Sequence, residues 1–264
     1  MSISKNGIPI TSLADWARLA SPKNPSAWVD DKSAKEFART WLAGKGTDLP
    51  QEVHSLLADH QAFGPVLEWH AEPEAKLRFD DFPGEPCNGD LVIYAKDSHG
   101  PYVIAVEAKA DETFGATVGD QLSHALECYL ENNRSNALKR IEQLSQALLG
   151  PRLPEDPALK EIRYQLLTAT AGALCEAERH NCNRALLVVH EFVTNATSDA
   201  NHARNALDLD AFANRISHGR ITSVRSHAIH GPFRLPRPTP FEKSATLYIG
   251  KVSRNLRGPS PISV

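Results

Sequence analysis

The sequence GDLVIYAKDSHGPYVIAVEAK at residues 89–109 contains two apolar runs separated by the polar segment DSHG at 97–100. This pattern predicts a β-hairpin with a four-residue turn. Centring the turn on that segment pairs residues whose numbers sum to 197, so Asp90 lies opposite Glu107. Directly opposed side chains have Cβ atoms about 5 Å apart, and like charges at that separation are destabilising. The hairpin therefore needs something that compensates for two adjacent carboxylates.

A divalent cation would provide that compensation. The side-chain period of two places Glu107 and Lys109 on one face of their strand, and the centred turn places Asp90 on the same face of the sheet. Paired carboxylates form an oxygen-rich site for a hard cation such as Mg²⁺. The simpler alternative is that Glu107 and Lys109 form a same-face ion pair. Because the flanking residues are apolar on both faces of the hairpin, a charged trio at its end favours a functional site.

The order of elements around this hairpin resembles the core of the PD-(D/E)XK nuclease superfamily, which has the restriction-endonuclease-like fold. The resemblance covers about residues 64–192, and residues 89–109 carry its specific part. Gly89 stands where the name-giving Pro of the motif stands. The implied fold is α/β, with a mixed central sheet flanked by helices.

The resemblance also implies a metal site and a reaction. Asp90, Glu107 and the backbone carbonyl of Ala108 would bind Mg²⁺ or Mn²⁺, and Lys109 would lie beside the attacking water. The catalytic residues implied are thus Asp90, Glu107 and Lys109. Many members of the superfamily add a further acid or a helical Gln, and the secondary candidates for these roles are Glu68, Glu74 and Gln165.

Periodicity divides the chain into three segments: a helical N-terminal extension at 1–63, the nuclease-like core at 64–192, and a basic C-terminal elaboration at 193–264. Helical patterns cover residues 1–63, 119–131, 135–149 and 157–179, the last with Asp156 as its N-cap. Strand patterns cover residues 66–70, 76–79, 91–94, 102–108, 185–192 and 245–252.

Composition is that of a cytoplasmic globular protein. The 264 residues are 41% hydrophobic and 23% charged, and no apolar run approaches the roughly 18 residues of a membrane span. The N-terminal residues have no cationic segment followed by an apolar one, so no signal peptide is expected. Four irregularly spaced cysteines fit reduced thiols rather than a disulfide framework.

Charge is distributed unevenly along the chain. Residues 201–264 contain ten Arg or Lys residues and three acids, a net charge of +7 in a chain whose total is −3. Such a segment suggests contacts with a polyanion, for which Arg234 and Arg237 are the candidates. A solvated basic surface is the alternative.

Together these features predict a Mg²⁺- or Mn²⁺-dependent nuclease that hydrolyses phosphodiester bonds in nucleic acid, with DNA as the expected substrate. A homodimer would fit cleavage of both strands. One alternative is a catalytically inactive module of the same fold that binds nucleic acid or a protein partner. Another is a glycosidase with paired carboxylates, although aromatic residues for stacking on sugars are few and the trio contains a Lys.

Overall fold

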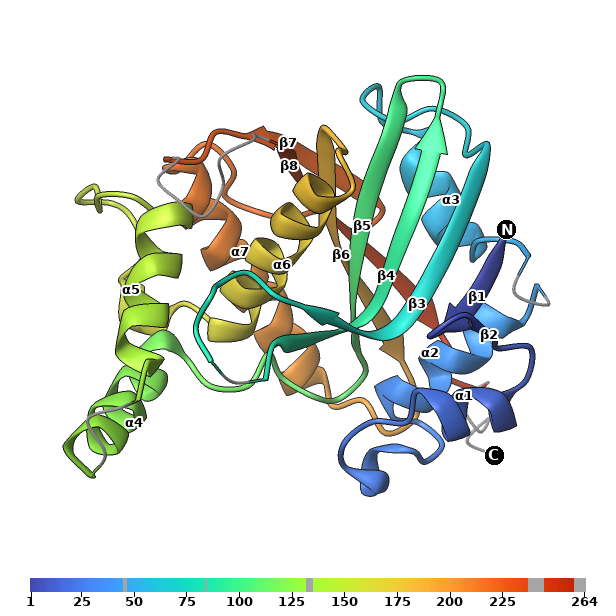
Figure 1. Cartoon of the computed structure of the whole chain (residues 1–264), viewed down its shortest axis with the longest axis horizontal. Helices are drawn as coiled ribbons and strands as arrows, with labels where there is room; N and C mark the ends of the chain where they lie inside the picture. The colour runs from blue at the N-terminus through green and yellow to red at the C-terminus, as the bar shows by residue number, and fades with distance from the viewer. Residues whose placement is uncertain (45–46, 84, 132–134, 237–244, 259–264) are drawn as a thin grey trace, which may run out of the picture.

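A computed structural model describes residues 1–44, 47–83, 85–131, 135–236 and 245–258. The fold is α/β, with a mixed eight-stranded sheet in the order β2-β1-β3-β4-β5-β6-β8-β7 (Figure 1). The strands are β1 (Ser2–Lys5), β2 (Ile8–Pro9), β3 (Glu68–Leu77), β4 (Cys87–Asp97), β5 (Gly100–Lys109), β6 (Arg184–Val193), β7 (Ala228–Phe233) and β8 (Thr246–Asn255). The α-helices of the described residues are α1 (Leu13–Leu19), α2 (Ser33–Leu42), α3 (Gln51–Ala58), α4 (Val118–Glu131), α5 (Ala137–Leu148), α6 (Tyr164–Arg179) and α7 (Asp199–Ser217).

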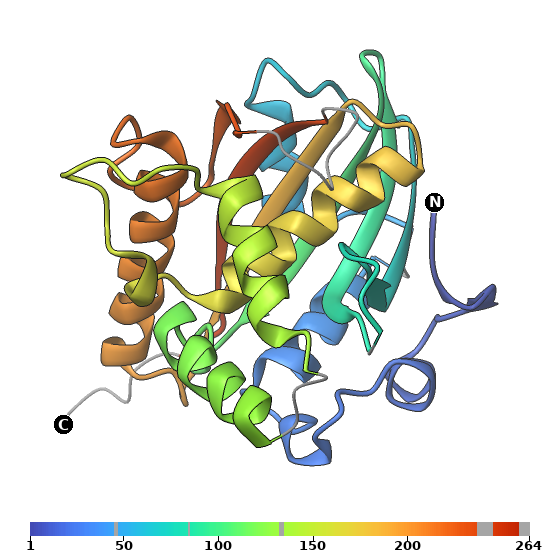
Figure 2. The ribbon, with the colours of Figure 1, turned by 60° about the vertical axis from the view of Figure 1, so that its left-hand side comes forward.

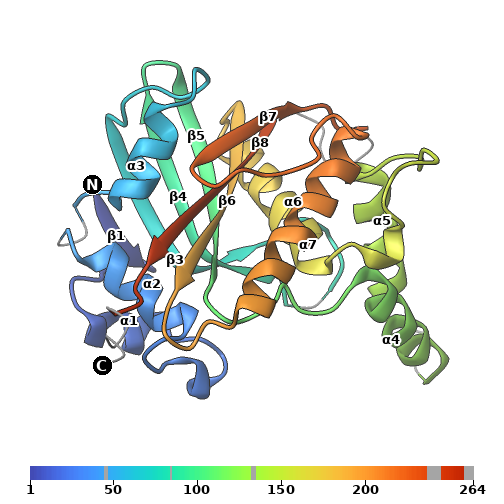
Figure 3. The ribbon, with the colours of Figure 1, turned by 180° about the vertical axis from the view of Figure 1, so that it is seen from behind.

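Helices cover both faces of the sheet and bury two hydrophobic clusters. On one face, α6 lies across β4, β5 and β6, and residues of α4, α5 and α7 complete that cluster (Figure 2). On the other face, α1, α2 and α3 pack against β4, β5, β6 and β8 (Figure 3). Strands β5, β6 and β8 run parallel to one another, so they are buried on both faces and their sequences are continuously apolar.

The predicted hairpin is confirmed with its register. β4 and β5 are antiparallel and pair from Leu91↔Val106 to Asp97↔Gly100, so paired residue numbers sum to 197. Apolar residues of each strand alternate between the two clusters, Val103 and Ala105 on the α6 side and Ile104 and Val106 on the other. A slip by one residue would exchange the two sets of side chains, which is why the register is fixed.

A buried ion pair closes the hairpin turn. Asp97 accepts hydrogen bonds from Arg184 at the start of β6, with Nη1 to Oδ2 at 2.9 Å and Nη2 to Oδ1 at 2.7 Å. The backbone N–H groups of Gly64 and His99 donate to the same carboxylate, each at 2.8 Å. Burial by itself would raise the pKa of Asp97, but Arg184 and these N–H groups lower that pKa to about 2. Asp97 is therefore an ionised, fully bonded carboxylate.

The guanidinium of Arg184 joins three segments of chain. Besides Asp97, it donates to the carbonyl oxygens of Ala62 (2.5 Å) and Gly100 (2.7 Å). Its guanidinium carbon lies 5.3 Å from the ring centroid of Phe63 and 4.7 Å from that of Tyr102. This residue thus ties the turn of β4 and β5 to β6 and to the segment that precedes β3.

The terminal segments contribute strands to the central sheet. The expectation that residues 1–63 are wholly helical is wrong, because β1 pairs in parallel with β3 at Ser2↔His70 and Ile3↔Ala71. The predicted late strand is confirmed as β8, which lies between β6 and β7. All three predicted segments therefore share one sheet.

Two other expectations are corrected. The predicted strands at 66–70 and 76–79 form the single strand β3, in which Pro73 is tolerated because β1 pairs only with His70 and Ala71 and leaves an edge beyond them. The predicted helix at 157–179 begins only at Tyr164. Asp156 does not cap it, because its carboxylate accepts from the backbone of Leu153 and forms an ion pair with the buried Arg215.

Replacement of Arg184 should destabilise the fold strongly. Arg184→Met leaves the charge of Asp97 buried without its partner, a change that typically costs about 3–5 kcal/mol of unfolding free energy. Asp97→Asn in the same chain removes that charge and keeps an oxygen acceptor, so the double variant should be more stable than Arg184→Met alone. Urea unfolding of the wild type, of Arg184→Met and of the double variant measures this.

Arg254→Met is the matched control, because Arg254 also forms a two-bond ion pair, with Glu52, but its side chain is 30% exposed. An Arg184→Met variant no less stable than Arg254→Met would contradict the role given to Asp97 and Arg184.

Candidate active site

Three carboxylates lie side by side on neighbouring strands, Glu74 on β3, Asp90 on β4 and Glu107 on β5; we call them the carboxylate row. The pairs Pro73↔Leu91 and Ala75↔Gly89 bracket Glu74 and Asp90. The pairing of β4 and β5 ends at Leu91↔Val106, so Asp90 and Glu107 are the next residues on each strand. The row therefore stands where the hairpin ladder stops.

Asp90 extends that ladder with its side chain. The backbone N–H of Ala108 donates to Oδ2 of Asp90 at 2.7 Å, which replaces the strand-to-strand hydrogen bond that ordinary pairing would supply. The carboxylate of Asp90 is thus held against β5 and beside Glu107.

Glu107 is 2% exposed and has two polar neighbours. The side-chain amide of Gln165, on the first turn of α6, donates to its Oε2 at 2.7 Å. The ammonium group of Lys109 lies 3.8 Å from the same oxygen and 5.2 Å from the ring centroid of Phe114. Lys109 is 5% exposed. The structure therefore brings the secondary candidate Gln165 into contact with the predicted trio.

Glu74 joins the row through an unusual backbone conformation. Its φ of 49° is left-handed, which is uncommon for a residue other than glycine and often marks a functional position. Strand β3 changes face at this point, because Ala71 belongs to the cluster beneath α1–α3 whereas Ala75 and Leu77 belong to the cluster beneath α6. The side-chain amide of Asn88 donates to Glu74 at 3.1 Å.

Burial raises the pKa values of all three carboxyl groups, and the charge of Asp90 adds to that effect at Glu107 and Glu74. Burial, with the negative charge of Asp90, raises the pKa of Glu107 to about 8 against the opposing effect of Lys109. Burial also raises the pKa of Asp90, opposed by Lys109 and by the N–H of Ala108. Burial and the charge of Asp90 raise the pKa of Glu74 to about 7. The positive charge near the carboxylate row is therefore too small to keep all three carboxyl groups ionised at their usual pKa values.

The row borders a pocket of about 440 Å³ in which Glu107, Lys109 and Gln165 are lining residues. The walls come from Cys87 and Asn88 of β4, from residues 113–116, from α4 and from the first turns of α6. Sequence reasoning missed Asn88, although it precedes Asp90 by two residues and the alternation of a strand points to it.

The donor set fits a small hard cation. Asp90 and Glu107 offer carboxylate oxygens, and Mg²⁺ typically takes one or two carboxylates and completes its shell with water and phosphate oxygens. In the described ranges of the chain, no group of three or more His, Cys, Asp or Glu side chains is arranged to hold a metal ion. For a cation bound here, the resemblance implies Asp90, Glu107 and the backbone carbonyl of Ala108 as the protein ligands.

Other predicted site residues lie elsewhere. Glu68 is at the far end of β3, where it forms an exposed ion pair with Lys96 at 3.2 Å, so it does not join the site. Arg234 is exposed in the segment after β7, and Arg237 lies outside the described residues.

The basic C-terminal segment is partly neutralised by acids elsewhere in the chain. Among the described residues of the segment at 201–264, four cations form ion pairs with acids outside it: Arg215 with Asp156, Lys251 with Glu191, Arg254 with Glu52, and Arg257 with Asp199. The net charge of +7 in the sequence therefore overstates the positive charge that this segment presents to solvent.

Comparison with known proteins gives one family. A family model described as Domain of unknown function (DUF6946) matches residues 9–256. No curated protein and no solved structure matches the chain. Within the described residues, no helix is both long enough and apolar enough to cross a membrane.

The raised pKa of Glu107 predicts a pH-dependent stability. Between about pH 4.5 and pH 8, Glu107 keeps its proton in the folded state and loses it in the unfolded state. The unfolding free energy of the metal-free protein should therefore fall as the pH rises through this range, by an amount on the order of a few kcal/mol. Glu107→Gln retains the shape of the side chain without the titration, so it should flatten this slope in urea unfolding measured with chelator.

Glu68→Gln is the matched control for this measurement, because Glu68 is an exposed glutamate on the same sheet. Equal pH slopes for Glu107→Gln and the wild type would show that Glu107 does not hold a proton in the folded state.

Proposed function

We propose that this chain, which belongs to the DUF6946 family, is a metal-dependent nuclease that hydrolyses phosphodiester bonds, with DNA as the substrate. The observation that carries the proposal is the buried juxtaposition of Asp90, Glu107 and Lys109 beside a pocket. A lysine 3.8 Å from a carboxylate that borders a second carboxylate combines metal ligands with a cation for phosphoryl chemistry.

The arrangement of elements supports a restriction-endonuclease-like core. Asp90 lies on β4, and Glu107-Ala108-Lys109 ends the neighbouring β5, while α6 crosses both strands and supplies Gln165. Strand β6 then pairs in parallel with β5. The polar groups stand at the carboxyl end of β5, where ligands of open α/β sheets bind.

Mg²⁺ or Mn²⁺ held by Asp90, Glu107 and the Ala108 carbonyl would lower the pKa of bound water and neutralise charge on the phosphoryl group. The side chains of the chain itself have separate tasks. Gln165 fixes the orientation of Glu107 through its hydrogen bond. Lys109 supplies a positive charge next to the reacting phosphoryl oxygens, where a preorganised cation stabilises the transition state.

Cleavage should require both the metal and Lys109. A labelled DNA substrate should be cut in Mg²⁺ or Mn²⁺ and left intact in EDTA. Lys109→Met keeps most of the side-chain volume and removes the charge, so it should lower kcat by on the order of 100-fold or more. Gel analysis of time courses measures the rates.

Lys251→Met is the matched control for that experiment, because Lys251 is also a buried sheet lysine, paired with Glu191 at 3.2 Å. Undiminished cleavage in EDTA would refute the metal dependence. Equal losses in the two variants would mean that Lys109 supports the fold rather than the reaction. A folded wild type that cuts neither single-stranded nor duplex DNA with either metal would favour the inactive module.

The carboxylate of Asp90 should lower the unfolding free energy of the metal-free protein and raise that of the metal-bound protein. Asp90→Asn removes one of the repelling charges and retains an acceptor for the N–H of Ala108, so the metal-free variant should be as stable as the wild type or about 1 kcal/mol more stable. Added Mn²⁺ should stabilise the wild type by RT ln(1 + [L]/Kd) and the variant much less. Melting temperatures across a Mn²⁺ series test this.

Asp90→Ala serves as the comparison, because it also loses the acceptor and should be destabilised without metal by about 1–3 kcal/mol. Equal responses of Asp90→Asn and the wild type to Mn²⁺ would remove Asp90 from the metal site.

A further inference from the structure

The charged groups of the candidate active site are buried at the side of an open pocket. The side chains of Glu107 and Lys109 are 3% and 7% exposed, and the pocket beside them is walled by β4, by residues 113–116, by α4 and by α6. The phosphates of a duplex lie on its outside, but its bases are paired and stacked inside. A nucleotide can therefore offer its base to a protein pocket only from a single strand or after extrusion from the duplex.

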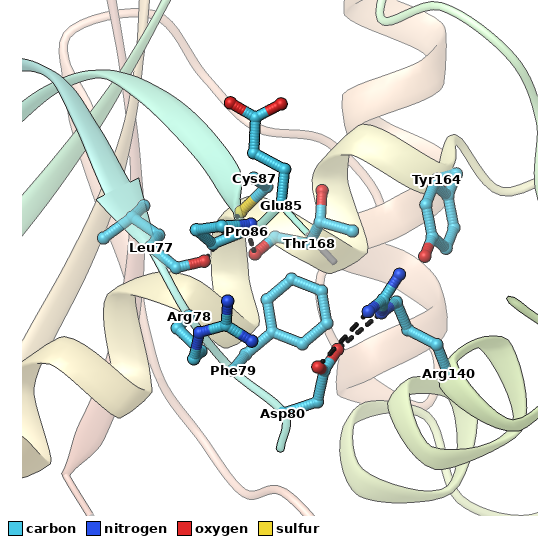
Figure 4. Close-up of a pocket in the computed structure, with 10 residues that line it drawn as sticks. All are labelled: Leu77, Arg78, Phe79, Asp80, Glu85, Pro86, Cys87, Arg140, Tyr164 and Thr168. Carbon is cyan, nitrogen blue, oxygen red and sulfur yellow. Dashed lines mark hydrogen bonds and ion pairs between the residues drawn. The ribbon is translucent and has the colours of Figure 1, made fainter. Parts of the chain in front are cut away.

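A second, smaller pocket adjoins the first one. It has a volume of about 180 Å³, and Cys87, Tyr164 and Thr168 line both pockets. The second pocket extends from this shared wall past residues 78–80 and 85–86 and reaches Arg140 of α5 (Figure 4). The two pockets therefore offer adjoining sites for consecutive monomers of a polymeric ligand.

Arg140 is positioned as a hydrogen-bond donor in the second pocket. Asp80, whose side chain is 5% exposed, accepts from its Nε at 2.5 Å and from its Nη2 at 3.3 Å, which fixes the plane of the guanidinium. Within the described part of the chain, the structure shows no hydrogen bond from Nη1 of Arg140. Arginine donates in a rigid fork that suits phosphate oxygens and base edges.

Aromatic rings complete the second pocket. Phe79 and Tyr164 line it, and in Figure 4 the hydroxyl group of Tyr164 points toward Arg140. Burial raises the pKa of Tyr164 to about 12, so the phenol stays neutral and its ring remains suited to stacking. Proteins that hold single-stranded nucleic acid combine such rings with nearby cations, because every base has a face on which a ring can stack.

We propose that the substrate is a single-stranded polynucleotide whose scissile phosphate enters the larger pocket while the adjoining nucleotide occupies the smaller one. In this arrangement Tyr164 stacks against the base of the adjoining nucleotide, and Arg140 donates hydrogen bonds to that nucleotide. The inference deepens the proposed function and rests on it for the scissile position.

Binding measured without catalysis tests the inference separately from the reaction. Fluorescence anisotropy in EDTA would compare a labelled single-stranded DNA of twelve nucleotides with a blunt duplex of the same length. The wild type should bind the single strand about tenfold more tightly than the duplex. Arg140→Gln and Tyr164→Leu should each weaken single-strand binding by about tenfold, the usual effect of losing a charged hydrogen bond or a stacking ring. Tyr164→Phe, which keeps the ring, should bind like the wild type.

Arg254→Gln is the matched control, because Arg254 forms the same Nε and Nη2 pair with a carboxylate on the opposite face of the sheet. Circular dichroism would confirm that each variant is folded. Duplex binding as tight as single-strand binding would overturn the inference, and so would equal affinities of Arg140→Gln and Arg254→Gln.

A parallel cleavage assay of the wild type in Mg²⁺ and Mn²⁺ separates the two hypotheses. If single-strand binding depends on Arg140 and Tyr164 but neither DNA is cleaved, the result would support the proposed single-strand binding site and refute the nuclease. If cleavage requires metal but single-strand binding does not depend on Arg140 and Tyr164, the result would support the nuclease and refute the proposed binding site.

Discussion

The buried ion pair between Asp97 and Arg184 joins the β4–β5 hairpin to β6, at the opposite end of the hairpin from the candidate site. Asp97 closes the turn, and Arg184 begins β6, so one pair fixes the relative positions of three strands. From that end, the alternation of side chains determines that Asp90, Glu107 and Lys109 emerge beneath α6. Replacing a buried ion pair with apolar residues is often neutral or favourable for stability. The contribution of this pair is better understood as specificity, because it selects one alignment of the strands that carry the site.

At the other end of the hairpin, the fold accepts an electrostatic cost. Glu74, Asp90 and Glu107 stand on adjacent strands, with Lys109 as the positive charge next to Glu107, and their raised pKa values report the imbalance. Each group also has a neutral hydrogen-bond donor that holds it in place: Asn88, the N–H of Ala108, and Gln165. A site with fixed oxygens and too little positive charge is preorganised for a cation, and the energy stored there would be recovered when a cation binds.

The sequence predicted the hairpin because both determinants of its register are local: a polar turn and two apolar runs. It also predicted β6 and β8, whose apolar residues are nearly continuous. The bend of β3 at Glu74 could not be predicted, since a left-handed glutamate has no sequence signature. The start of α6 was misplaced because Asp156 and Pro157 match the pattern of a helix N-terminus. The real partner of Asp156 is Arg215, 59 residues away. Gln165 could be proposed from the resemblance, but its contact with Glu107 depends on how α6 crosses the sheet. Such contacts between distant segments carry no periodic signal.

The position of β8 has a consequence for how the molecule assembles. This strand follows the other strands of the sheet in chain order, yet it pairs along ten positions with β6 near the middle of the sheet. Until residues 246–255 arrive, β6 has an open edge of backbone donors and acceptors, and its side chains are apolar on both sides. Exposed edges of this kind recruit strands from other molecules. Closing the sheet also requires a contact between distant segments, which slows folding. The nascent chain therefore carries an unpaired strand edge between the synthesis of β6 and that of β8, and shielding of this edge during that interval would oppose aggregation.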